Sequence, residues 1–210
     1  AFLSHLAVER RVSASTQNQA KAALLFLYKR VLNVDLAWLD EVVQAKRERR
    51  LPVVLSPEEV RAVLGHMDGT MGLIAALLYG TGMRVLEGLR LRVKDVDFGR
   101  REIIVREGKG GKDRVTLLPD ALSGPLEVHL ARVKALHAQD LAEGFGEVAL
   151  PDALAVKYRG AGRSWPWQWV FPSANRSTDP RSGVVRRHHL YLDSVQKAMK
   201  RAAMKAKLDK

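Results

Sequence analysis

One stretch of the chain carries an arginine, a carboxylate and a lysine that together could act on a phosphodiester. An apolar helix end is interrupted by Gly80-Thr81-Gly82, and a helix restarts with Arg84 in its first turn. Glu87 follows three residues later, on the same predicted helix face. At that spacing the carboxylate can orient the guanidinium, and a guanidinium so held can stabilise a developing oxyanion. Taken alone, the pair equally fits an ordinary helix salt bridge.

Lys109 lies at the tip of a predicted β-hairpin. Apolar and polar residues alternate over Arg101–Glu107 and Arg114–Leu118, and the glycines between these strands permit positive φ. A lysine on such a tip can protonate a leaving oxygen. The alternative is a solvated turn. The loop GKGGKD lacks the spacing of a phosphate-binding P-loop, and GTGMRV lacks the third glycine of a dinucleotide-binding fingerprint.

Helices are predicted on both sides of this stretch. Ser56-Pro57-Glu58-Glu59 has the pattern of a capped helix start, with proline in the first turn and a glutamate that completes a capping box. Apolar periodicity predicts further helices over Ser13–Leu32, Thr70–Gly80, Pro119–Gly144 and Leu192–Leu208, and a short one within Val148–Lys157. The expected fold class is mainly α with a small antiparallel β-hairpin or sheet, that is, α+β.

Composition favours a nucleic-acid partner. The chain has 210 residues, 47% of them apolar, and a formal net charge of +12. A surplus of that size suits a polyanion held through its phosphates, although charge that serves only solubility is the alternative. The absence of cysteine excludes disulfides and thiol catalysis and fits the reducing cytosol. No apolar run approaches the length of a membrane span, and no HExxH-like spacing indicates a metal site.

The two runs GTGMRVLEGLRLRVKDVDF and IIVREGKGGKDRVTLLP resemble the first half of the catalytic domain of tyrosine recombinases. Among these, they are most similar to the integron integrases. The resemblance implies that Arg84 is the first catalytic arginine, that Glu87 supports it and that Lys109 is the catalytic lysine. It further implies cutting and rejoining of DNA through a 3′-phosphotyrosine without cofactors, by a homo-oligomer that forms a tetrameric synapse in the bacterial cytoplasm, associated with the nucleoid when bound to DNA.

The same resemblance divides the chain into three parts. Residues 1–45 are similar to the end of the helical, SAM-like core-binding domain, and residues 46–55 form a basic linker. Residues 56–210 correspond to the first part of the catalytic domain. Within them, residues 148–190 resemble an insertion that integron integrases use to hold bases protruding from a folded single-stranded attC site. The implied partners are attC DNA and duplex attI-type DNA, with no membrane.

Seven residues of this chain are candidate DNA contacts, and the resemblance implies the four that would contact bases. The candidate base contacts share an aromatic or apolar face and are Trp167, Pro180, His188 and His189. The candidate contacts to the DNA backbone are basic and are Lys112, Arg186 and Arg187. A physical argument supports the first group, because aromatic and imidazole faces stack on an unpaired base of any identity.

The nucleophile that the family requires is not found in this chain. We see neither a His-x-x-Arg motif nor a further histidine or tryptophan after the insertion, and no tyrosine stands in a family nucleophile context. Tyr191 matches a family position of a different role, and the other tyrosines are Tyr28, Tyr79 and Tyr158. We therefore expect a fragment, cut at both ends and inactive alone, of a larger recombinase.

Two alternatives remain open. The first is a phage-type or Xer-type tyrosine recombinase that acts on duplex sites, which would lack the tryptophan and His-His insertion. The second is a non-catalytic DNA-binding protein that acts as a repressor or architectural factor. The combined Arg84 and Lys109 spacing argues against this second alternative for the parent protein.

Overall fold

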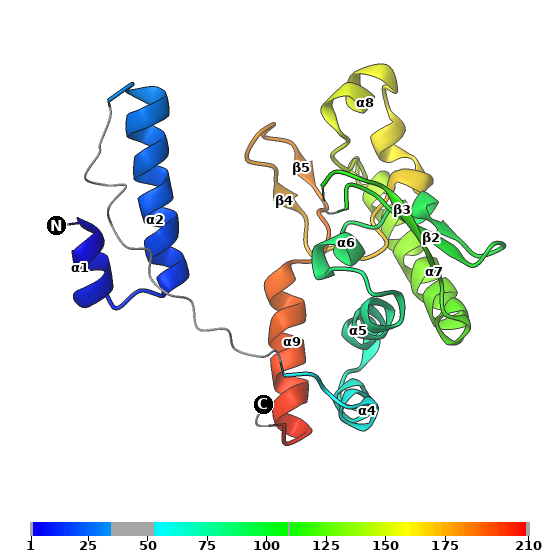
Figure 1. The fold of residues 1–210 in the computed structure, drawn as a ribbon. Coiled ribbons are helices and arrows are strands. Elements are labelled where there is room, and N and C mark those ends of the chain that lie inside the picture. The colour runs from blue at the N-terminus through cyan, green and yellow to red at the C-terminus, as the bar shows by residue number, and fades with distance from the viewer. Residues whose placement is uncertain (1, 35–52, 109, 209–210) are drawn as a thin grey trace. The chain divides into compact units, whose positions relative to one another are not determined.

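A computed structural model describes residues 2–34, 53–108 and 110–208 (Figure 1). The chain forms two compact units, Ala1–Val54 and Leu55–Lys210, each of which is described by itself. Residues 46–52 of the predicted linker lie outside the described residues. Lys109, the predicted catalytic lysine, also lies outside them.

The first unit is a pair of helices. Helix α1 spans Phe2–Val8, and α2 (Ala14–Phe26) continues as a π-helical turn, η1 (Leu27–Val31). Ser13 and Ser15 are both candidate caps by sequence, and the Ser13 hydroxyl caps α2 by accepting the Thr16 backbone N–H at 3.3 Å. The predicted apolar stripe of this helix is only partly covered, since Leu27 and Val31 are 42% and 58% exposed. Among the described residues of this unit only α1 packs against α2, so the far end of the stripe meets no helix.

The second unit contains most of the helices and a small sheet. Its helices are α4 (Pro57–Gly65), α5 (Gly69–Thr81), α6 (Val85–Leu89), α7 (Asp120–Ala142), α8 (Asp152–Lys157) and α9 (Leu192–Lys205). The antiparallel sheet has the order β1-β2-β3, with strands Val96–Asp97, Glu102–Val105 and Arg114–Leu117. The predicted fold class, mainly α with a small antiparallel sheet, is confirmed.

Helix α5 is apolar because it lies at the centre of this unit. Ile74 and Leu77 on α5 are 1% and 0% exposed and share one core with Ile103 of β2, Leu126 of α7 and Phe171. Leu130 and Val133 of α7 are also buried, as predicted, whereas Leu141 near its end is 36% exposed. The sheet and α7 therefore enclose the helix that leads into Arg84.

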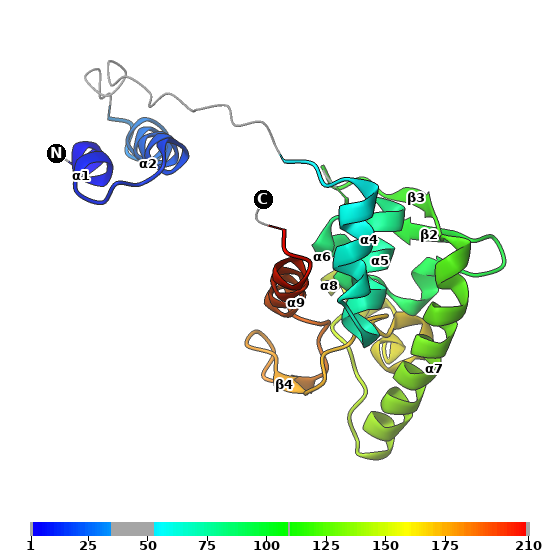
Figure 2. The ribbon, with the colours of Figure 1, turned by 90° about the horizontal axis from the view of Figure 1, so that it is seen from below.

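Helix α4 begins with the predicted capping box, and α9 packs against α4 and α5 through its apolar face. Ser56 and Glu59 form the predicted capping box of α4, with N···O distances of 2.8 and 3.2 Å. Helix α9 packs against α4 and α5 (Figures 1 and 2) through Val195 and Ala202. The apolar spacing of this helix predicts an inward face of Val195, Met199, Ala202 and Ala203. For Met199 that prediction is wrong, because its side chain is 37% exposed and Ala198 packs toward the core in its place. Ala198 lies three residues after Val195, one turn along the same face.

Residues 148–190 contain little regular structure besides α8. Two short 3₁₀ turns, η3 (Ala161–Arg163) and η4 (Trp165–Trp167), precede a two-stranded sheet of β4 (Ser177–Thr178) and β5 (Val185–Arg186). Isolated bridges join Arg92 to Trp169 and Pro172 to His189. The Arg92–Trp169 bridge thus joins this segment to the residues that follow α6.

No helix of the described residues is both long and apolar enough to span a membrane. In the same residues, no cluster of three or more histidine and acidic side chains has the arrangement of a metal site.

Candidate active site and DNA-contact residues

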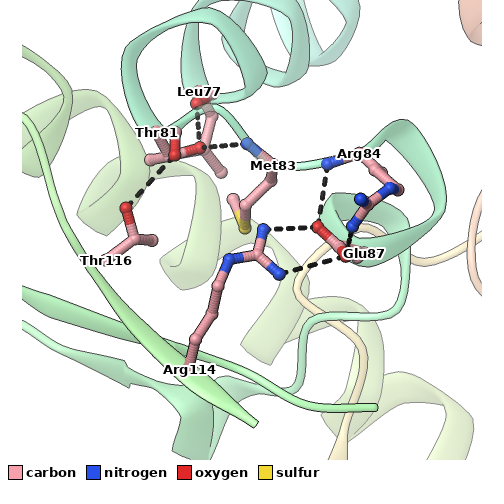
Figure 3. A network of polar contacts seen from close by, with 7 residues as sticks. All are labelled: Leu77, Thr81, Met83, Arg84, Glu87, Arg114 and Thr116. Carbon is pink, nitrogen blue, oxygen red and sulfur yellow. Dashed lines mark hydrogen bonds and ion pairs between the residues drawn. The ribbon is translucent and has the colours of Figure 1, made fainter. Parts of the chain in front are cut away.

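The glycine turn after α5 is fixed by hydrogen bonds (Figure 3). Gly82 ends the helix in the left-handed region at φ +65°, a conformation that glycine adopts without strain. The Thr81 hydroxyl donates to the Leu77 carbonyl at 2.6 Å, and the Thr81 carbonyl accepts the Thr116 hydroxyl at 3.2 Å. Because Thr116 lies on β3, the second of these bonds joins the glycine turn before α6 to the hairpin.

Arg84 and Glu87 meet at the start of α6. Arg84 occupies the N-cap position, just before the predicted first turn, with φ −68° and ψ 150°. The Glu87 carboxylate accepts the Arg84 backbone N–H at 2.9 Å and its side-chain Nη1 at 2.7 Å. One carboxylate therefore caps the helix and orients the guanidinium.

Arg114 is a third member of this cluster that the sequence did not reveal. Its Nη2 and Nη1 donate to the two oxygens of Glu87 at 2.6 and 3.1 Å. Arg114 pairs across the hairpin with Val105, which is 1% exposed, so it lies on the core-facing side of β3. That position is the signal that could have identified it, because a charge facing the core needs a partner.

The cluster keeps Glu87 ionised and leaves Arg84 accessible. The pKa of Glu87 is lowered to about 2, first by the hydrogen bond from Arg114 and then by those from the Arg84 backbone and side chain. Burial of the carboxylate acts in the opposite direction but is outweighed. The Glu87 side chain is 8% exposed, while those of Arg84 and Arg114 are 57% and 38% exposed. Both Glu87 oxygens already accept hydrogen bonds, so Glu87 serves as a support rather than as a general base. One carboxylate opposite two guanidiniums leaves net positive charge, which suits an anionic phosphodiester.

The hairpin loop packs directly beside this cluster. At Gly108, an added Cβ would lie 2.9 Å from Nη1 of Arg114 and 2.8 Å from the Lys112 carbonyl oxygen. The loop ends are joined by the Gly108 N–H to the Lys112 carbonyl at 3.0 Å and by the Arg106–Asp113 ion pair at 3.2 Å. The segment that leads to the predicted lysine thus lies beside Arg114 and Glu87, and the Lys112 side chain is exposed.

A second cluster is built around two tryptophans of residues 148–190. The Arg92 guanidinium lies over the Trp169 ring, 3.2 Å from its centroid, and Trp169 meets His189 edge-on at 5.3 Å. Arg92 also donates to the carbonyls of Trp167 and Ala149, both at 2.8 Å. Burial lowers the pKa of Arg92 to about 10, so it stays charged at neutral pH. Arg92 was missed because its partners lie far along the chain.

Arg186 and Arg187 bind protein groups in this structure. Arg187 makes a bidentate ion pair with Asp140 of α7, at 2.6 and 2.8 Å, and also donates to the carbonyls of Ser173 and Ala174. Arg186 pairs with Glu147 at 3.2 Å and Asp179 at 3.7 Å. The two side chains are 14% and 12% exposed. They anchor the β4–β5 hairpin, a structural role that the sequence did not predict.

The predicted base contacts are brought together only in part. Trp167 and His189 both adjoin the Arg92–Trp169 pair, and both are half-buried, as is the neighbouring His188. Burial, more than the nearby arginines, lowers the pKa of His189, which therefore favours the neutral ring. Pro180 is exposed in the β4–β5 turn. Within the part of the chain that the structure describes, no hydrogen bond or ring contact joins Pro180 to the other three.

Comparison with known protein families gives this arrangement a context. The profile described as "Phage integrase family" matches residues 53–210, and "Phage integrase, N-terminal SAM-like domain" matches residues 1–38. The chain belongs to the phage integrase family. The members of this family are the tyrosine recombinases, which agrees with the resemblance drawn from the two quoted runs.

Several members of the phage integrase family are similar to the chain. Proteins named "Integrase/recombinase" from Escherichia coli and Pseudomonas aeruginosa are each 58% identical over 210 residues. The match takes in the whole of this chain and 62% of each of those proteins. The tyrosine recombinase XerA of Thermococcus onnurineus is 37% identical over 147 residues, covering 59% of this chain and 52% of that protein. The chain therefore spans less than two thirds of the length of these relatives.

A solved structure supports the fold. The XerH site-specific recombinase, bound to its difH substrate in a pre-cleavage complex, matches all of this chain and 54% of its own with a TM-score of 0.53. At 18% sequence identity the likeness concerns the fold alone.

Proposed function

We propose that the whole protein is a site-specific recombinase that cuts and rejoins DNA through a 3′-phosphotyrosine. The observation that carries this proposal is the Arg84–Glu87–Arg114 cluster, packed against the hairpin loop that contains Lys109. Membership of the phage integrase family supports it. The same cluster would suit a DNA-binding protein without catalysis, but binding alone does not need a fixed guanidinium beside a lysine-bearing loop.

In this reaction each residue would have a separate task. Arg84, oriented by Glu87, would neutralise the charge that develops on the scissile phosphate, and Arg114 would fix the position of Glu87. Lys109 would protonate the departing 5′ oxygen. The nucleophilic tyrosine is assigned to the part of the whole protein that this chain does not span. Energy is conserved in the phosphotyrosine bond, so rejoining requires no nucleotide cofactor. The arginine and lysine side chains would supply the positive charge, so the proposed chemistry uses no metal.

We further propose that the protein is an integron integrase, which integrates and excises gene cassettes at folded single-stranded attC and duplex attI-type sites. The support is the Trp167, His188 and His189 group beside Arg92 and Trp169, where half-buried aromatic and imidazole rings could stack on an unpaired base. Pro180, Lys112 and the family's tetrameric synapse belong to the same proposal. The alternative, an Xer-type recombinase on duplex DNA, is favoured by the similarity to XerA.

The integron proposal is tested by DNA preference. The whole protein should bind a hairpin with protruding bases more tightly than the same hairpin without them. Each stacking contact is worth about 1–3 kcal/mol, or roughly 5- to 150-fold in affinity. Replacing both His188 and His189 with Ala should remove most of this preference while duplex affinity changes little, because phosphate contacts do not depend on unpaired bases.

The control for this test is His66→Ala, which changes an exposed histidine at the end of α4. It should leave the preference intact. A wild-type protein with no preference for protruding bases would instead support the alternative, an Xer-type recombinase that acts on duplex DNA. Equal losses on bulged and paired hairpins in the double variant would assign His188 and His189 to support of the fold.

A further inference from the structure

The Lys94 side chain covers a face of Trp167. Lys94 lies in the 3₁₀ turn η2 (Val93–Asp95), and its ammonium nitrogen is 3.1 Å from the centroid of the Trp167 ring. Both side chains are half-buried. A cation at this position is held by the negative face of the ring. In the protein without DNA, a ring face that the proposed function assigns to base stacking is therefore occupied.

In the described part of the chain, the Lys94 ammonium has no acidic partner. Among the residues that the structure describes, no carboxylate lies within ion-pair distance of it. The neighbouring Asp95 already accepts hydrogen bonds from Nε of Arg106 at 2.7 Å and from the Arg92 backbone N–H at 3.1 Å. Burial, with Arg106 and Arg92 nearby, lowers the pKa of Lys94 despite the attraction of Asp95. The ammonium is thus a partly desolvated cation whose nearest carboxylate is already bonded to other groups, and a phosphate would stabilise it.

The two cations that cover tryptophans in this cluster are held differently. Arg92, over Trp169, is fixed by two carbonyl oxygens at 2.8 Å. Lys94, over Trp167, sits on a flexible four-carbon stem, and no hydrogen bond or ion pair from the described residues holds its ammonium on the ring. Arg92 is therefore part of the scaffold, whereas Lys94 can leave its ring without breaking a hydrogen bond.

We propose that Lys94 is a specificity-determining residue for unpaired bases: a protruding base takes the Trp167 face from the ammonium, and Lys94 moves to the phosphate of that nucleotide. The exchange rests on the proposed function, in which Trp167 stacks on a base. A single protruding nucleotide supplies both groups that the exchange needs, a flat ring for Trp167 and an anion for Lys94. Paired DNA offers the phosphate but no free base, so Lys94 stays on the ring. Lys94 thereby adds an ionic contact only when a base protrudes.

The test is the salt dependence of DNA binding by the whole protein and its Lys94→Met variant. Three hairpins are compared: one with a protruding base, one with an abasic nucleotide at that position, and one fully paired. Each phosphate contact contributes about 0.7 to 0.9 to the slope of log affinity against log salt. With the protruding base, Lys94→Met should reduce the slope by about that amount and weaken binding several-fold at low salt. On the abasic and paired hairpins, slope and affinity should stay at wild-type values.

The chain offers a matched control in Lys157→Met. Lys157 lies 5.4 Å from the centroid of the Tyr158 ring in the same segment. Its variant should keep all three slopes at wild-type values. If Lys94→Met lowers the melting temperature by more than a few degrees, Lys94→Gln replaces it, because the amide keeps a polar end on the same stem. Lys94→Gln should show the same selective change in slope.

Two outcomes overturn the exchange. An unchanged slope on the protruding-base hairpin would mean that Lys94 never reaches the phosphate. Equal reductions on all three hairpins would make Lys94 an ordinary phosphate contact. Failure of the proposed function looks different, because the wild-type protein would then bind the protruding-base and abasic hairpins equally well.

Discussion

The Arg84 cluster and the segment of residues 148–190 use arginine in opposite ways. At Glu87, two arginines share one buried carboxylate, and the Arg84 side chain remains 57% exposed. At Asp140, Arg187 also meets a buried carboxylate, but its side chain is 12% exposed and its remaining donors bind backbone carbonyls. The residue types are the same in both regions. Exposure decides which arginine can bind a ligand and which one holds the fold.

The difference also changes which groups face solvent in each region. Around Glu87 the accessible groups are cationic, which suits a phosphate. In residues 148–190, Arg186 and Arg187 bind protein groups, and the half-buried groups near them are the Trp167, His188 and His189 rings. The first region is therefore suited to chemistry on the DNA backbone, and the second to contacts with bases.

The largest expected effect is on the cleavage rate and comes from substitutions in the Arg84 cluster and the adjoining hairpin loop. In the whole protein, Arg84→Ala should slow cleavage of a suicide substrate by about 100- to 1,000-fold, because a donor to the developing charge is lost. Lys109→Ala should slow it by about 100- to 10,000-fold with little loss of binding. A 5′-thio leaving group needs no protonation and should rescue Lys109→Ala but not Arg84→Ala.

The control for these rates is Arg61→Ala, since Arg61 is an exposed arginine on α4. It should cleave at the wild-type rate on both substrates. Without thio rescue, Lys109 would be a phosphate contact rather than the general acid.

The next effect concerns stability and comes from the second region. Arg187→Ala leaves the buried Asp140 with only the longer ion pair to Arg176, at 3.5 Å, and should cost about 3 kcal/mol of unfolding free energy in urea denaturation. A combined Asp140→Leu and Arg187→Met variant should lose less, because no lone charge stays buried. The exposed pair Arg61–Glu58 is the comparison, and Arg61→Ala should cost under about 1 kcal/mol. If Arg187→Ala cost no more than Arg61→Ala, the contrast between the two regions would be lost.

The smallest effect is a pH dependence at Glu87. Its folded pKa of about 2 lies below the ordinary value of 4.5, so its stabilising contribution is complete above pH 4.5 and is lost as pH falls toward 2. Glu87→Gln should therefore melt below the wild-type temperature at pH 7, and the gap should close between about pH 4.5 and pH 2. The exposed Glu127→Gln should show no such gap. A gap that stays constant down to pH 2 would contradict the ion-pair explanation.

Local patterns predicted much of this molecule. The capping box at Ser56 and Glu59, the hairpin around residues 101–118 and the Arg84–Glu87 contact all depend on neighbours within a few residues, and each is present. The contacts that were missed join distant segments. Arg114 lies 27 residues from Glu87, and Arg187 lies 47 residues from Asp140. Strand alternation places Arg114 on the core-facing side of β3, but no local pattern identifies Glu87 as its partner or Asp140 as the partner of Arg187.

Three glycines of the hairpin loop look alike in the sequence but are required for different reasons. Gly110 and Gly111 have φ of +81° and +73° with open space around them, so an asparagine, which tolerates the left-handed region, could replace either. Gly108 has no such freedom, because any side chain would collide with the Lys112 carbonyl oxygen and with the Arg114 guanidinium. In a library randomised over the whole loop, selection for activity would retain polar variants at positions 110 and 111 and only glycine at position 108.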